Sequence, residues 1–455
     1  MRTRSHLRLC LGWRTKFGRE WLLSDKLFFA FVAGGILLRL LLTVFAGGGV
    51  FTPWRAGGDA PFYVQLASNV ACGKGFAYYG GASAFRPPLY PLFLAAMMRL
   101  FSSSAFLVIR ALQFAAGLVT VELCARTTLR MFGYEAACVA RVIALFLPTL
   151  VVPTTELMTE CFATLLVAMF FNSILFNPAL SKRSTAALLG LIVGLATLLR
   201  FNMAILGVVA LVTLALGAKW SQAWRRMCLL IAVAGLVVAP WVVRNLIVFQ
   251  GHVILSTQGG INAVQGVLTP QGRAQGNDAE VLQARLGWQA SDLESNEPAR
   301  KRLASEPDLD RQAWAQAFAL WRQENWRLIP LSLRKLGYFW LSTDQVFWTR
   351  SFSPRQRVLR FCAVLTHWCV LVLALLGWLQ LRKGHHSIFV FLAEYAVLVS
   401  LVHLPFIMTS RYRVPLLETL LVVLASGGMA MTQKRIFVSL AWRRKDRNDS
   451  RIPYI

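Results

Sequence analysis

Residues 27–46 read LFFAFVAGGILLRLLLTVFA, an almost unbroken apolar run. A helix needs about 20 mostly apolar residues to cross the hydrocarbon core of a bilayer, and this run has that length. It is too long for the core of a cleaved signal peptide, and seven basic residues precede it in the segment 1–26. The run therefore predicts an uncleaved membrane helix whose N-terminal side faces the cytoplasm.

The rest of the chain repeats this pattern. Of its 455 residues 56% are hydrophobic and 15% are charged, against about 25% charged in an ordinary soluble domain, so a soluble enzyme is excluded. We expect an all-α polytopic membrane protein with about ten transmembrane helices. The predicted spans lie at about 27–46, 105–125, 136–152, 157–176, 185–200, 203–218, 227–248, 360–381, 387–408 and 413–432.

The formal net charge of +27 is unevenly placed along the sequence. Residues 250–355 hold ten of the 21 acidic residues and twelve Lys or Arg, a net charge of +2, so +25 remains for the membrane part. Basic residues in short loops orient a membrane protein, and a cytoplasmic N-terminus places the basic loops between spans on the cytoplasmic side. Topology therefore explains the charge, and no nucleic-acid partner is expected.

Three parts are expected along the chain. An N-terminal membrane module at 1–248 contains the first outer loop, 47–104; a periplasmic segment follows at 249–358; C-terminal membrane helices and a basic cytoplasmic tail occupy 359–455. This arrangement predicts a multi-pass membrane protein whose outer loops lie on the side away from the cytoplasm.

The outer loops are expected to contain short helices. One begins at Asp59, because the sequence Asp-Ala-Pro favours a helix start and apolar residues within 62–70 share one face. Another covers 88–100, where about thirteen apolar residues are too few to cross a bilayer, so this helix is expected to lie flat on the outer surface. Aromatic residues within 314–321 recur at helical spacing, which fits either an interfacial helix or a small subdomain with its own aromatic core.

Acidic residues at the outer ends of the spans are candidate functional groups, because charge there is costly and usually has a function. Asp59 precedes a helix, where a carboxylate is commonly only an N-cap. Glu156 and Glu160 lie one helical turn apart at the outer start of a span, where the helix dipole accounts for one of them. With Asp59, a second carboxylate at this edge suits an acid–base pair or a divalent metal site. The histidines and cysteines show no metal-binding or disulfide spacing.

Arginines on the same side form a second group of candidates. Arg86 lies in the stiff Arg-Pro-Pro run before the surface helix, where the alternative role is snorkelling to lipid headgroups. Arg200 and Arg244 lie near the outer ends of spans. Arg411 and Arg413 fall in a very short outer turn, against the orientation rule. Because guanidinium groups bind phosphate in a bidentate manner, the group indicates an anionic, phosphate-bearing ligand that approaches from the bilayer.

These candidates sit in short motifs that follow one another in a fixed order. The motifs are GDAPFY at 58–63, RPPLYPLFLA at 86–95, Pro148 followed by Thr159 and Glu160, PWVVRN at 240–245, STQGGIN at 256–262 and RYRVP at 411–415. Together they cover about 55–415 and resemble the bacterial GT-C glycosyltransferases that use polyprenyl-phosphate sugar donors. That superfamily includes protein O-mannosyltransferases and the transferases that add aminoarabinose or galacturonic acid to lipid A.

The resemblance implies roles for individual residues. Asp59 matches the proposed catalytic base, and Glu160 matches the second acidic residue better than Glu156, because relatives carry Thr-Glu just ahead of an apolar span. Arg86 stands where relatives carry a basic residue near the donor phosphate. The further candidates for donor-phosphate binding are Arg244, Arg411 and Arg413, and the remaining candidates for the site are Glu156, Arg200 and Tyr63. A divalent metal between Asp59 and Glu160 stays open, since relatives differ on this.

The implied activity is the inverting transfer of a sugar to an acceptor hydroxyl group on a lipid, a polysaccharide or a protein, at the outer face of the membrane. A lipid or glycan transporter or flippase is the main alternative, and a non-catalytic scaffold subunit is a third. A transporter tends to carry repeat symmetry and charges at the bilayer midplane. The unusual charges of this sequence gather at the outer ends of spans, which favours interfacial chemistry. The long polar segment and the short C-terminal region depart from the family pattern.

Overall fold

The computed structural model describes residues 25–45, 59–78, 81–176, 182–217, 219–268, 306–343 and 354–449. These residues are almost entirely helical, and the sheet within them is a single small hairpin of β1 (Ala77–Tyr78) and β2 (Gly81–Ala82). The expected all-α membrane fold is therefore confirmed.

Six helical segments among the described residues are long and apolar enough to cross a membrane. One combines α4 (Leu89–Phe101), η1 (Ser102–Ser104) and α5 (Ala105–Phe132). The other five are α2 (Asp25–Phe45), α11 (Trp220–Val248), α18 (Pro354–Gly384), α19 (His386–His403) and α20 (Ser410–Asp449).

The four other predicted spans are also helical, but they are bent or short. The pair α6 (Tyr134–Phe146) and α7 (Pro148–Val151), which ends in η2 (Val152–Thr154), bends by 68°. Three apolar helices have 17 residues or fewer. They are α8 (Glu160–Ile174), α9 (Arg183–Leu199), and η3 (Phe201–Ala204) with α10 (Ile205–Gly217).

The bend after α6 has a local cause. Leu147 precedes Pro148 and is extended, with φ −64° and ψ 116°, because a residue before proline avoids helical dihedral angles. The break leaves the last carbonyl groups of α6 without helical partners. Arg39 of α2 supplies them: its Nη2 donates to the carbonyl oxygen of Ala144 at 2.5 Å and its Nε to that of Leu145 at 3.0 Å.

Other buried cations stabilise helix ends in the same way. Arg110 donates from Nη1 to the carbonyl oxygen of Thr43 at 2.9 Å, near the end of α2. Lys335 donates from Nζ to the carbonyl oxygens of Gly266 at 3.1 Å and Leu404 at 2.5 Å, at the ends of α12 (Gly259–Leu268) and α19. A cation is stabilised at a helix C-terminus by the carbonyl groups and by the helix dipole. These three basic residues are therefore structural.

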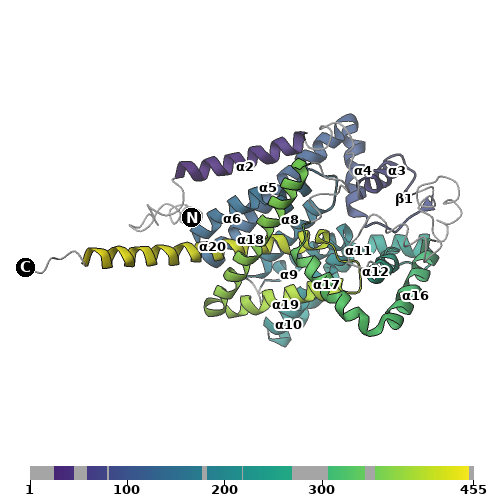
Figure 1. Ribbon diagram of the computed structural model, residues 1–455. Helices are drawn as coiled ribbons and strands as arrows, with labels where there is room; N and C mark the ends of the chain where they lie inside the picture. Colours follow the sequence, from purple (N-terminus) through teal and green to yellow (C-terminus); the bar gives the residue numbers. More distant parts are fainter. Residues whose placement is uncertain are drawn as a thin grey trace, which may run out of the picture.

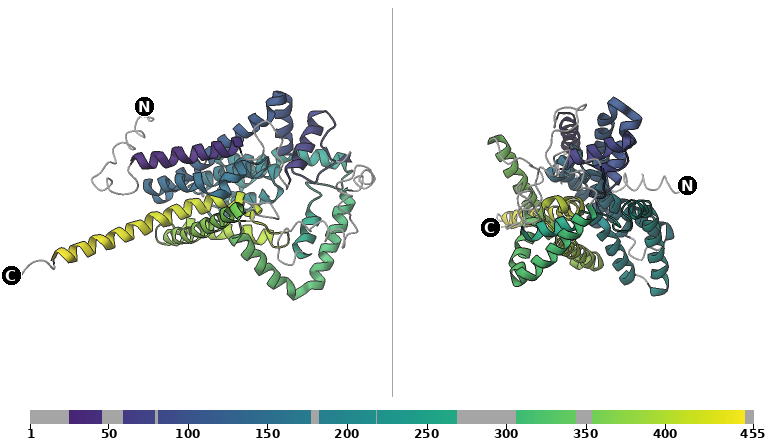
Figure 2. Two further views of the ribbon diagram at one scale, coloured as in Figure 1. Left: turned by 45° about the horizontal axis from the view of Figure 1, so that its top comes forward. Right: turned by 90° about the vertical axis from the view of Figure 1, so that its right-hand side faces the viewer.

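One end of the bundle carries the short elements of the outer loops. In Figures 1 and 2, α3 (Ala60–Ala71), α4, the hairpin, α12 and α16 (Glu306–Glu324) lie at the end remote from the C-terminal end of α20. The helices α3 and α4 pack against each other, with Tyr63 and Tyr90 in edge-to-face contact at 5.3 Å between ring centroids. The two short helices expected in the first outer loop are thus present.

The aromatic helix of the polar segment is α16, which packs on α12. Trp314 contacts Phe318 and Trp321, at 5.7 and 6.3 Å between centroids, and Phe406 at 6.0 Å. Ala313, Ala317 and Leu320 are buried against residues of α12. This geometry favours a small unit with its own apolar core over an isolated interfacial helix. From α16 the chain continues through η4 (Asn325–Arg327) into α17 (Leu328–Leu341).

The central helix of the bundle is α20. In the stretch of highest hydropathy 89% of its residues are buried, against 11–28% in the five other candidate spans. It crosses α18 closely at two glycines: a Cβ atom on Gly428 would lie 2.0 Å from the carbonyl oxygen of Leu373, and one on Gly377 would lie 1.9 Å from that of Leu424. Small residues allow such close helix contacts in membrane proteins.

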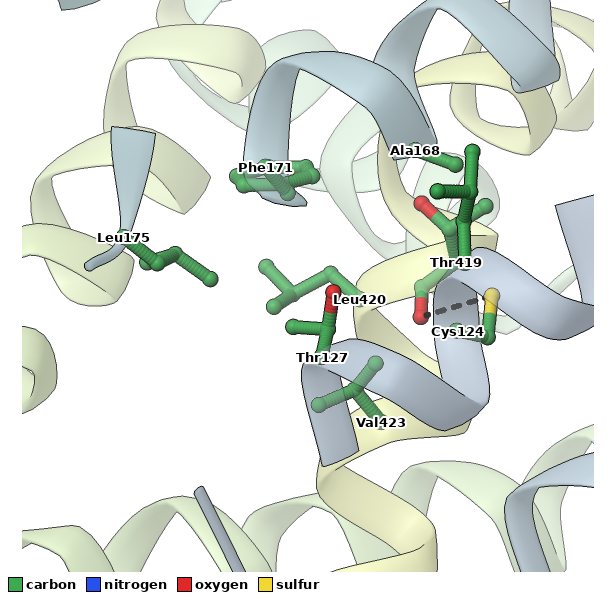
Figure 3. A pocket seen from close by; sticks show the side chains of 9 residues that line it. Cys124, Thr127, Ala168, Phe171, Leu175, Thr419, Leu420 and Val423 are labelled. Atoms are coloured by element: carbon green, nitrogen blue, oxygen red, sulfur yellow. Dashed lines mark hydrogen bonds between the residues drawn. The ribbon is translucent and has the colours of Figure 1, made fainter. Parts of the chain in front are cut away.

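The other side of α20 packs tightly against α5 and α8. Figure 3 shows Cys124 and Thr127 facing Thr419 and Leu420, with Phe171 on the third helix. The remaining cavity has about 10 Å³ of space and an apolar lining, too little for more than one water molecule. The start of α20 is therefore held in place by packing on several sides.

Candidate active site

Asp59 immediately precedes α3, and Pro61 lies in the first turn of that helix. The carboxylate of Asp59 makes no capping hydrogen bond to α3. Instead, Oδ1 accepts from Nη2 of Arg86 at 2.5 Å and Oδ2 accepts from Nη1 of Arg411 at 2.5 Å. The side chain is 14% exposed. The N-cap interpretation is therefore wrong for the side chain, because both oxygens bind arginines.

Glu160 is the first residue of α8, where the helix dipole favours a negative charge. Its side chain is 1% exposed, so the charge needs compensating partners. Oε1 accepts from Nη1 of Arg200 at 2.9 Å and from Nε of Arg411. Nη1 of Arg200 also donates to the hydroxyl oxygen of Thr159 at 3.0 Å. Two guanidinium groups thus share one carboxylate oxygen.

Arg411 joins the two carboxylates. It is the second residue of α20, and its guanidinium group bonds to Asp59 through Nη1 and to Glu160 through Nε. We call Asp59, Arg86, Glu160, Arg200 and Arg411 the charge cluster. It brings together the first outer loop, the start of α8, the end of α9 and the start of α20. Four of the candidates predicted from motifs, with Arg200, therefore meet in one place.

Three aromatic rings surround the guanidinium group of Arg86 within the charge cluster. Its guanidinium carbon lies 5.3 Å from the ring centroid of Phe62 and 5.0 Å from that of Phe85. The Tyr63 ring is 6.0 Å away, and Tyr63 is buried against α4. Tyr63 therefore forms part of the wall of the site. Cation–π contacts of this kind stabilise a guanidinium group by about 0.5–2 kcal/mol, depending on exposure.

The charges of the cluster strongly affect the pKa of Asp59. Burial alone would raise this pKa, but the guanidinium groups of Arg411 and Arg86 outweigh burial and lower the pKa of Asp59 to about 2. Three arginines face two carboxylates, so the charge cluster carries a net charge of +1. A buried site with excess positive charge favours an anionic ligand.

Glu156 lies beside the charge cluster, in the turn between η2 and α8. It is 9% exposed, and the structure gives its carboxyl group no ion pair among the described residues. Burial and the nearby carboxylate of Glu160 raise the pKa of Glu156 to about 8, against a weaker opposing effect of Arg411. The side chain is therefore mainly protonated at neutral pH, in contrast to Glu160.

Arg413 lies away from the charge cluster, contrary to its predicted role. The motif RYRVP forms the first turn of α20 rather than an outer turn, and two residues along a helix are about 200° apart around its axis. Arg413 is fully buried and binds Glu418 at 3.0 Å and the carbonyl oxygens of Phe339 and Ser342 at 2.7 and 2.9 Å. It stabilises the C-terminal end of α17 and does not line the site.

Arg244 is also outside the charge cluster. Its Nη1 donates to the carbonyl oxygen of Ser83 at 2.9 Å and its Nη2 to that of Phe76 at 3.0 Å, while the guanidinium group lies 5.0 Å from the ring centroid of Trp241. These contacts hold the hairpin segment against α11. The geometry therefore does not support the prediction that Arg244 binds the donor phosphate.

Glu306, which no sequence motif marks as functional, positions the segment before Arg86. It begins α16, is buried, and accepts hydrogen bonds from the backbone nitrogen of Ala84 at 2.8 Å and from the hydroxyl group of Thr257. Burial raises the pKa of Glu306, and these hydrogen bonds oppose the change. Thr257 in the STQGGIN motif could have indicated a hydrogen-bond partner. That partner, Glu306, lies in the polar segment, where acidic residues are common and none stands out.

Two glycines of the same motif allow α16 to approach. A Cβ atom on Gly260 would lie 2.5 Å from the carbonyl oxygen of Asp310, and one on Gly259 would lie 3.0 Å from the Trp314 ring. The backbone nitrogen of Gly260 donates to Oδ1 of Asp310 at 2.7 Å. The motif thus joins the polar segment to the first outer loop behind Arg86.

A divalent metal fits this set of side chains poorly. Within the described ranges, no three His, Cys, Asp or Glu side chains lie close enough to hold a metal ion together. Between the two carboxylates of the charge cluster lies the guanidinium group of Arg411, which bonds to both. The cation that joins Asp59 and Glu160 is therefore a side chain of the protein itself.

Comparison with known proteins gives one family and one fold. A family model described as dolichyl-phosphate-mannose-protein mannosyltransferase matches residues 85–243. No curated protein matches the chain. The oligosaccharyltransferase of Archaeoglobus fulgidus in its apo form is similar in structure, with a TM-score of 0.53 and 12% identity over 92% of this chain and 52% of that chain.

Two further structures are similar to different degrees. The same archaeal enzyme in complex with Zn and sulfate has a TM-score of 0.53 and 13% identity over 93% of this chain and 52% of that chain. ArnT from Cupriavidus metallidurans bound to undecaprenyl phosphate has a TM-score of 0.40 and 15% identity over 89% and 77%. That score is too low to establish a shared fold. The chain spans about half the length of the archaeal enzymes.

The fold is similar to that of the archaeal oligosaccharyltransferase, and residues 85–243 match the mannosyltransferase family model, so both findings agree with the resemblance to the GT-C glycosyltransferases drawn from the motifs. Within that class, the segment that carries Arg86, Glu160 and Arg200 is similar to the dolichyl-phosphate-mannose-protein mannosyltransferases.

Proposed function

We propose that the protein is an inverting glycosyltransferase that moves a sugar from a polyprenyl-phosphate donor to an acceptor hydroxyl group. One observation carries the proposal. A partly buried carboxylate, Asp59, lies between Arg86 and Arg411, and Arg411 also binds the second carboxylate, Glu160. A base beside several phosphate-binding groups is what this transfer requires.

In the proposed reaction, Asp59 accepts the proton of the acceptor hydroxyl group while its oxygen attacks the anomeric carbon of the donor sugar. The new carbon–oxygen bond forms as the bond from the anomeric carbon to the phosphate oxygen breaks. Its electron pair leaves with the polyprenyl phosphate. General-base assistance of this kind contributes about 10²–10⁴-fold to the rate.

Arg86 and Arg411 stabilise the charge that develops on the leaving phosphate. Both guanidinium groups are largely shielded from solvent, with side chains 13% and 14% exposed, so their field is weakly screened by water. Glu160 and Arg200 act as positioning residues. Glu160 accepts from Nε of Arg411, whereas Asp59 accepts from Nη1, and Arg200 in turn binds Glu160. The net positive charge of the cluster suits this phosphate.

The proposed location of the site is the periplasmic face of a bacterial inner membrane. The charge distribution supports it, because the basic loops of the sequence fall on the opposite side of the predicted spans. The outer-loop elements that carry Asp59 and Arg86 lie at the end of the bundle remote from the C-terminal end of α20 (Figure 1). Membrane lipids and a lipid, polysaccharide or protein acceptor are the partners that this location implies.

The test compares envelope glycans by mass spectrometry in three strains: one lacking the protein, one complemented with the natural chain, and one complemented with Asp59→Asn. We expect the deletion to remove one sugar from an envelope component and the natural chain to restore it. Asp59→Asn should not restore it, because an amide cannot accept the hydroxyl proton. Folded protein in the membrane, measured by thermal unfolding, should be unchanged.

Two further variants separate the acidic residues. Glu160→Gln should be severe, since it releases both Arg200 and Arg411. Glu156→Gln should be mild, because that carboxyl group has no ion pair and is already mainly neutral. Full restoration of the glycan by Asp59→Asn would reject the catalytic role of Asp59. It would favour a transporter or a scaffold subunit as the function of the protein.

A further inference from the structure

Asp59 is a weak base in the arrangement that the structure shows. Each of its two carboxylate oxygens holds an arginine nitrogen at 2.5 Å, Oδ1 with Arg86 and Oδ2 with Arg411. Each oxygen keeps a lone pair for an acceptor hydroxyl group, but each also accepts a charge-assisted hydrogen bond, about twice as strong as a neutral one, which stabilises the anion and lowers its basicity. The groups assigned to the donor phosphate therefore weaken the base.

Arg86 retains hydrogen-bonding capacity in this state. Its Nε is buried and has no hydrogen-bond partner in the part of the chain that the structure describes. A buried donor without a partner costs about 1–3 kcal/mol. A phosphate group that approached the Nε and Nη2 edge of Arg86 would satisfy Nε and compete with Asp59 for Nη2.

We infer that Arg86 and Arg411 exchange partners: the phosphate of the donor displaces Asp59 from both arginines and so frees the carboxylate as a base. This inference rests on the proposed function. It makes donor binding the event that activates Asp59, so the donor binds first and the acceptor second. Arg86 and Arg411 then act twice, as inhibitors of the base in the empty site and as phosphate ligands in the loaded site.

The surrounding contacts suit such an exchange. Arg411 is held at its Nε by Glu160, which is itself held by Arg200, so the guanidinium group can release Asp59 at Nη1 without leaving the site. Burial is already the largest effect on Asp59 and raises its pKa, so the pKa rises from about 2 once the arginines turn to the phosphate and their opposing effect weakens. The carboxylate gains basicity when a hydroxyl group is to be deprotonated.

The exchange predicts that Asp59 weakens phosphate binding. Affinity for a synthetic short-chain polyprenyl phosphate should be measured with the purified full chain in detergent. Asp59→Asn should bind it about tenfold more tightly than the natural chain, because the anion no longer competes with a carboxylate. If Asp59→Asn does not fold, Asp59→Ala removes the same charge and carries the same expectation.

A double-mutant cycle separates competition from simple repulsion between two negative charges. In an Arg86→Gln background, which keeps Arg411 as a phosphate ligand, the exchange predicts a smaller gain from Asp59→Asn, since one of the two shared partners is gone. An equal gain in both backgrounds would show repulsion through space and overturn the exchange. Glu156→Gln is the matched control, a buried carboxyl group beside the cluster without an ion pair, and it should leave the affinity unchanged.

The outcomes distinguish the inference from the function on which it rests. Phosphate binding that is weakened by Arg86→Gln but unchanged by Asp59→Asn would overturn the exchange and leave the donor assignment intact. Absence of binding to the natural chain and to every variant would reject the donor assignment itself.

Discussion

Arg411 and Arg413 are two residues apart and have opposite surroundings. Arg411 faces Asp59 and Glu160 at the solvent-accessible end of the bundle, whereas Arg413 is fully buried with Glu418 and the end of α17. A buried ion pair leaves an uncompensated charge when one partner is removed, at a cost of about 3–5 kcal/mol. The same substitution at the two positions should therefore affect different properties.

We expect Arg411→Gln to abolish sugar transfer with a modest change in stability, because the site loses a phosphate ligand while Asp59 keeps Arg86 and Glu160 keeps Arg200. Arg413→Gln should lower the thermal unfolding midpoint strongly, since Glu418 is left buried without its main partner. Thermal unfolding and turnover of both variants provide the measurement. Equal stability of the two would contradict the assignment of Arg413 to the bundle interior.

The folding stability of the protein should depend on pH through Glu156. Its pKa is raised from 4.5 to about 8 in the folded chain, so above pH 4.5 the unfolded chain has lost a proton that the folded chain still holds. The contribution of Glu156 to the free energy of unfolding is therefore complete below pH 4.5 and decreases as the pH rises toward 8. We expect Glu156→Gln to match the natural chain in unfolding midpoint at acid pH and to exceed it near pH 8. Parallel curves for the two proteins would reject the burial of an unpaired carboxyl group.

At the scale of elements, α20 connects packing to chemistry. Its contact with α18 depends on Gly377 and Gly428, and its first turn delivers Arg411 to the two carboxylates. A substitution in the middle of this helix can therefore displace the site without touching it. The close crossing gives a direct way to examine that connection.

Gly428→Ala should destabilise the bundle by about 1–3 kcal/mol, because the new methyl group meets the backbone of α18 and the helices must separate. Gly235→Ala in α11 is the matched control: nothing lies within 4 Å of the added atom, and alanine favours a helix by about 0.5–1 kcal/mol. Thermal unfolding in detergent should thus move in opposite directions for the two variants. The same direction for both would reject the close α18–α20 contact.

The helices were largely predictable because apolar runs of membrane length are unambiguous in a sequence. The candidate site was partly predictable for the same reason: Asp59, Glu160 and Arg86 stand out where charge is costly. The side of a helix on which each residue lies was not predictable from the motif. The sequence alone therefore groups Arg413 with Arg411, although the two side chains point in different directions. Glu306 was missed because a buried acidic residue in a polar segment looks like its exposed neighbours.

For the whole molecule, the charge asymmetry predicts which face carries the charge cluster. We expect Ala290→Cys, in the polar segment outside the described residues, to react with a membrane-impermeant thiol reagent in intact spheroplasts. Lys182→Cys, ahead of α9, should react only after lysis, because the basic loops face the cytoplasm. The reverse pattern would invert the topology and place the charge cluster on the cytoplasmic face.

Arg411 has a consequence for how the chain is made. It leaves the ribosome 352 residues after Asp59 and 251 residues after Glu160, the two groups that it neutralises. During synthesis, both acidic side chains reach the membrane boundary before their shared counter-ion exists. A nascent chain halted before α20 can pair Asp59 only with Arg86 and Glu160 only with Arg200, and it lacks the helix around which the others pack. We therefore expect a chain truncated before α20 to be less stable in the membrane than the complete chain.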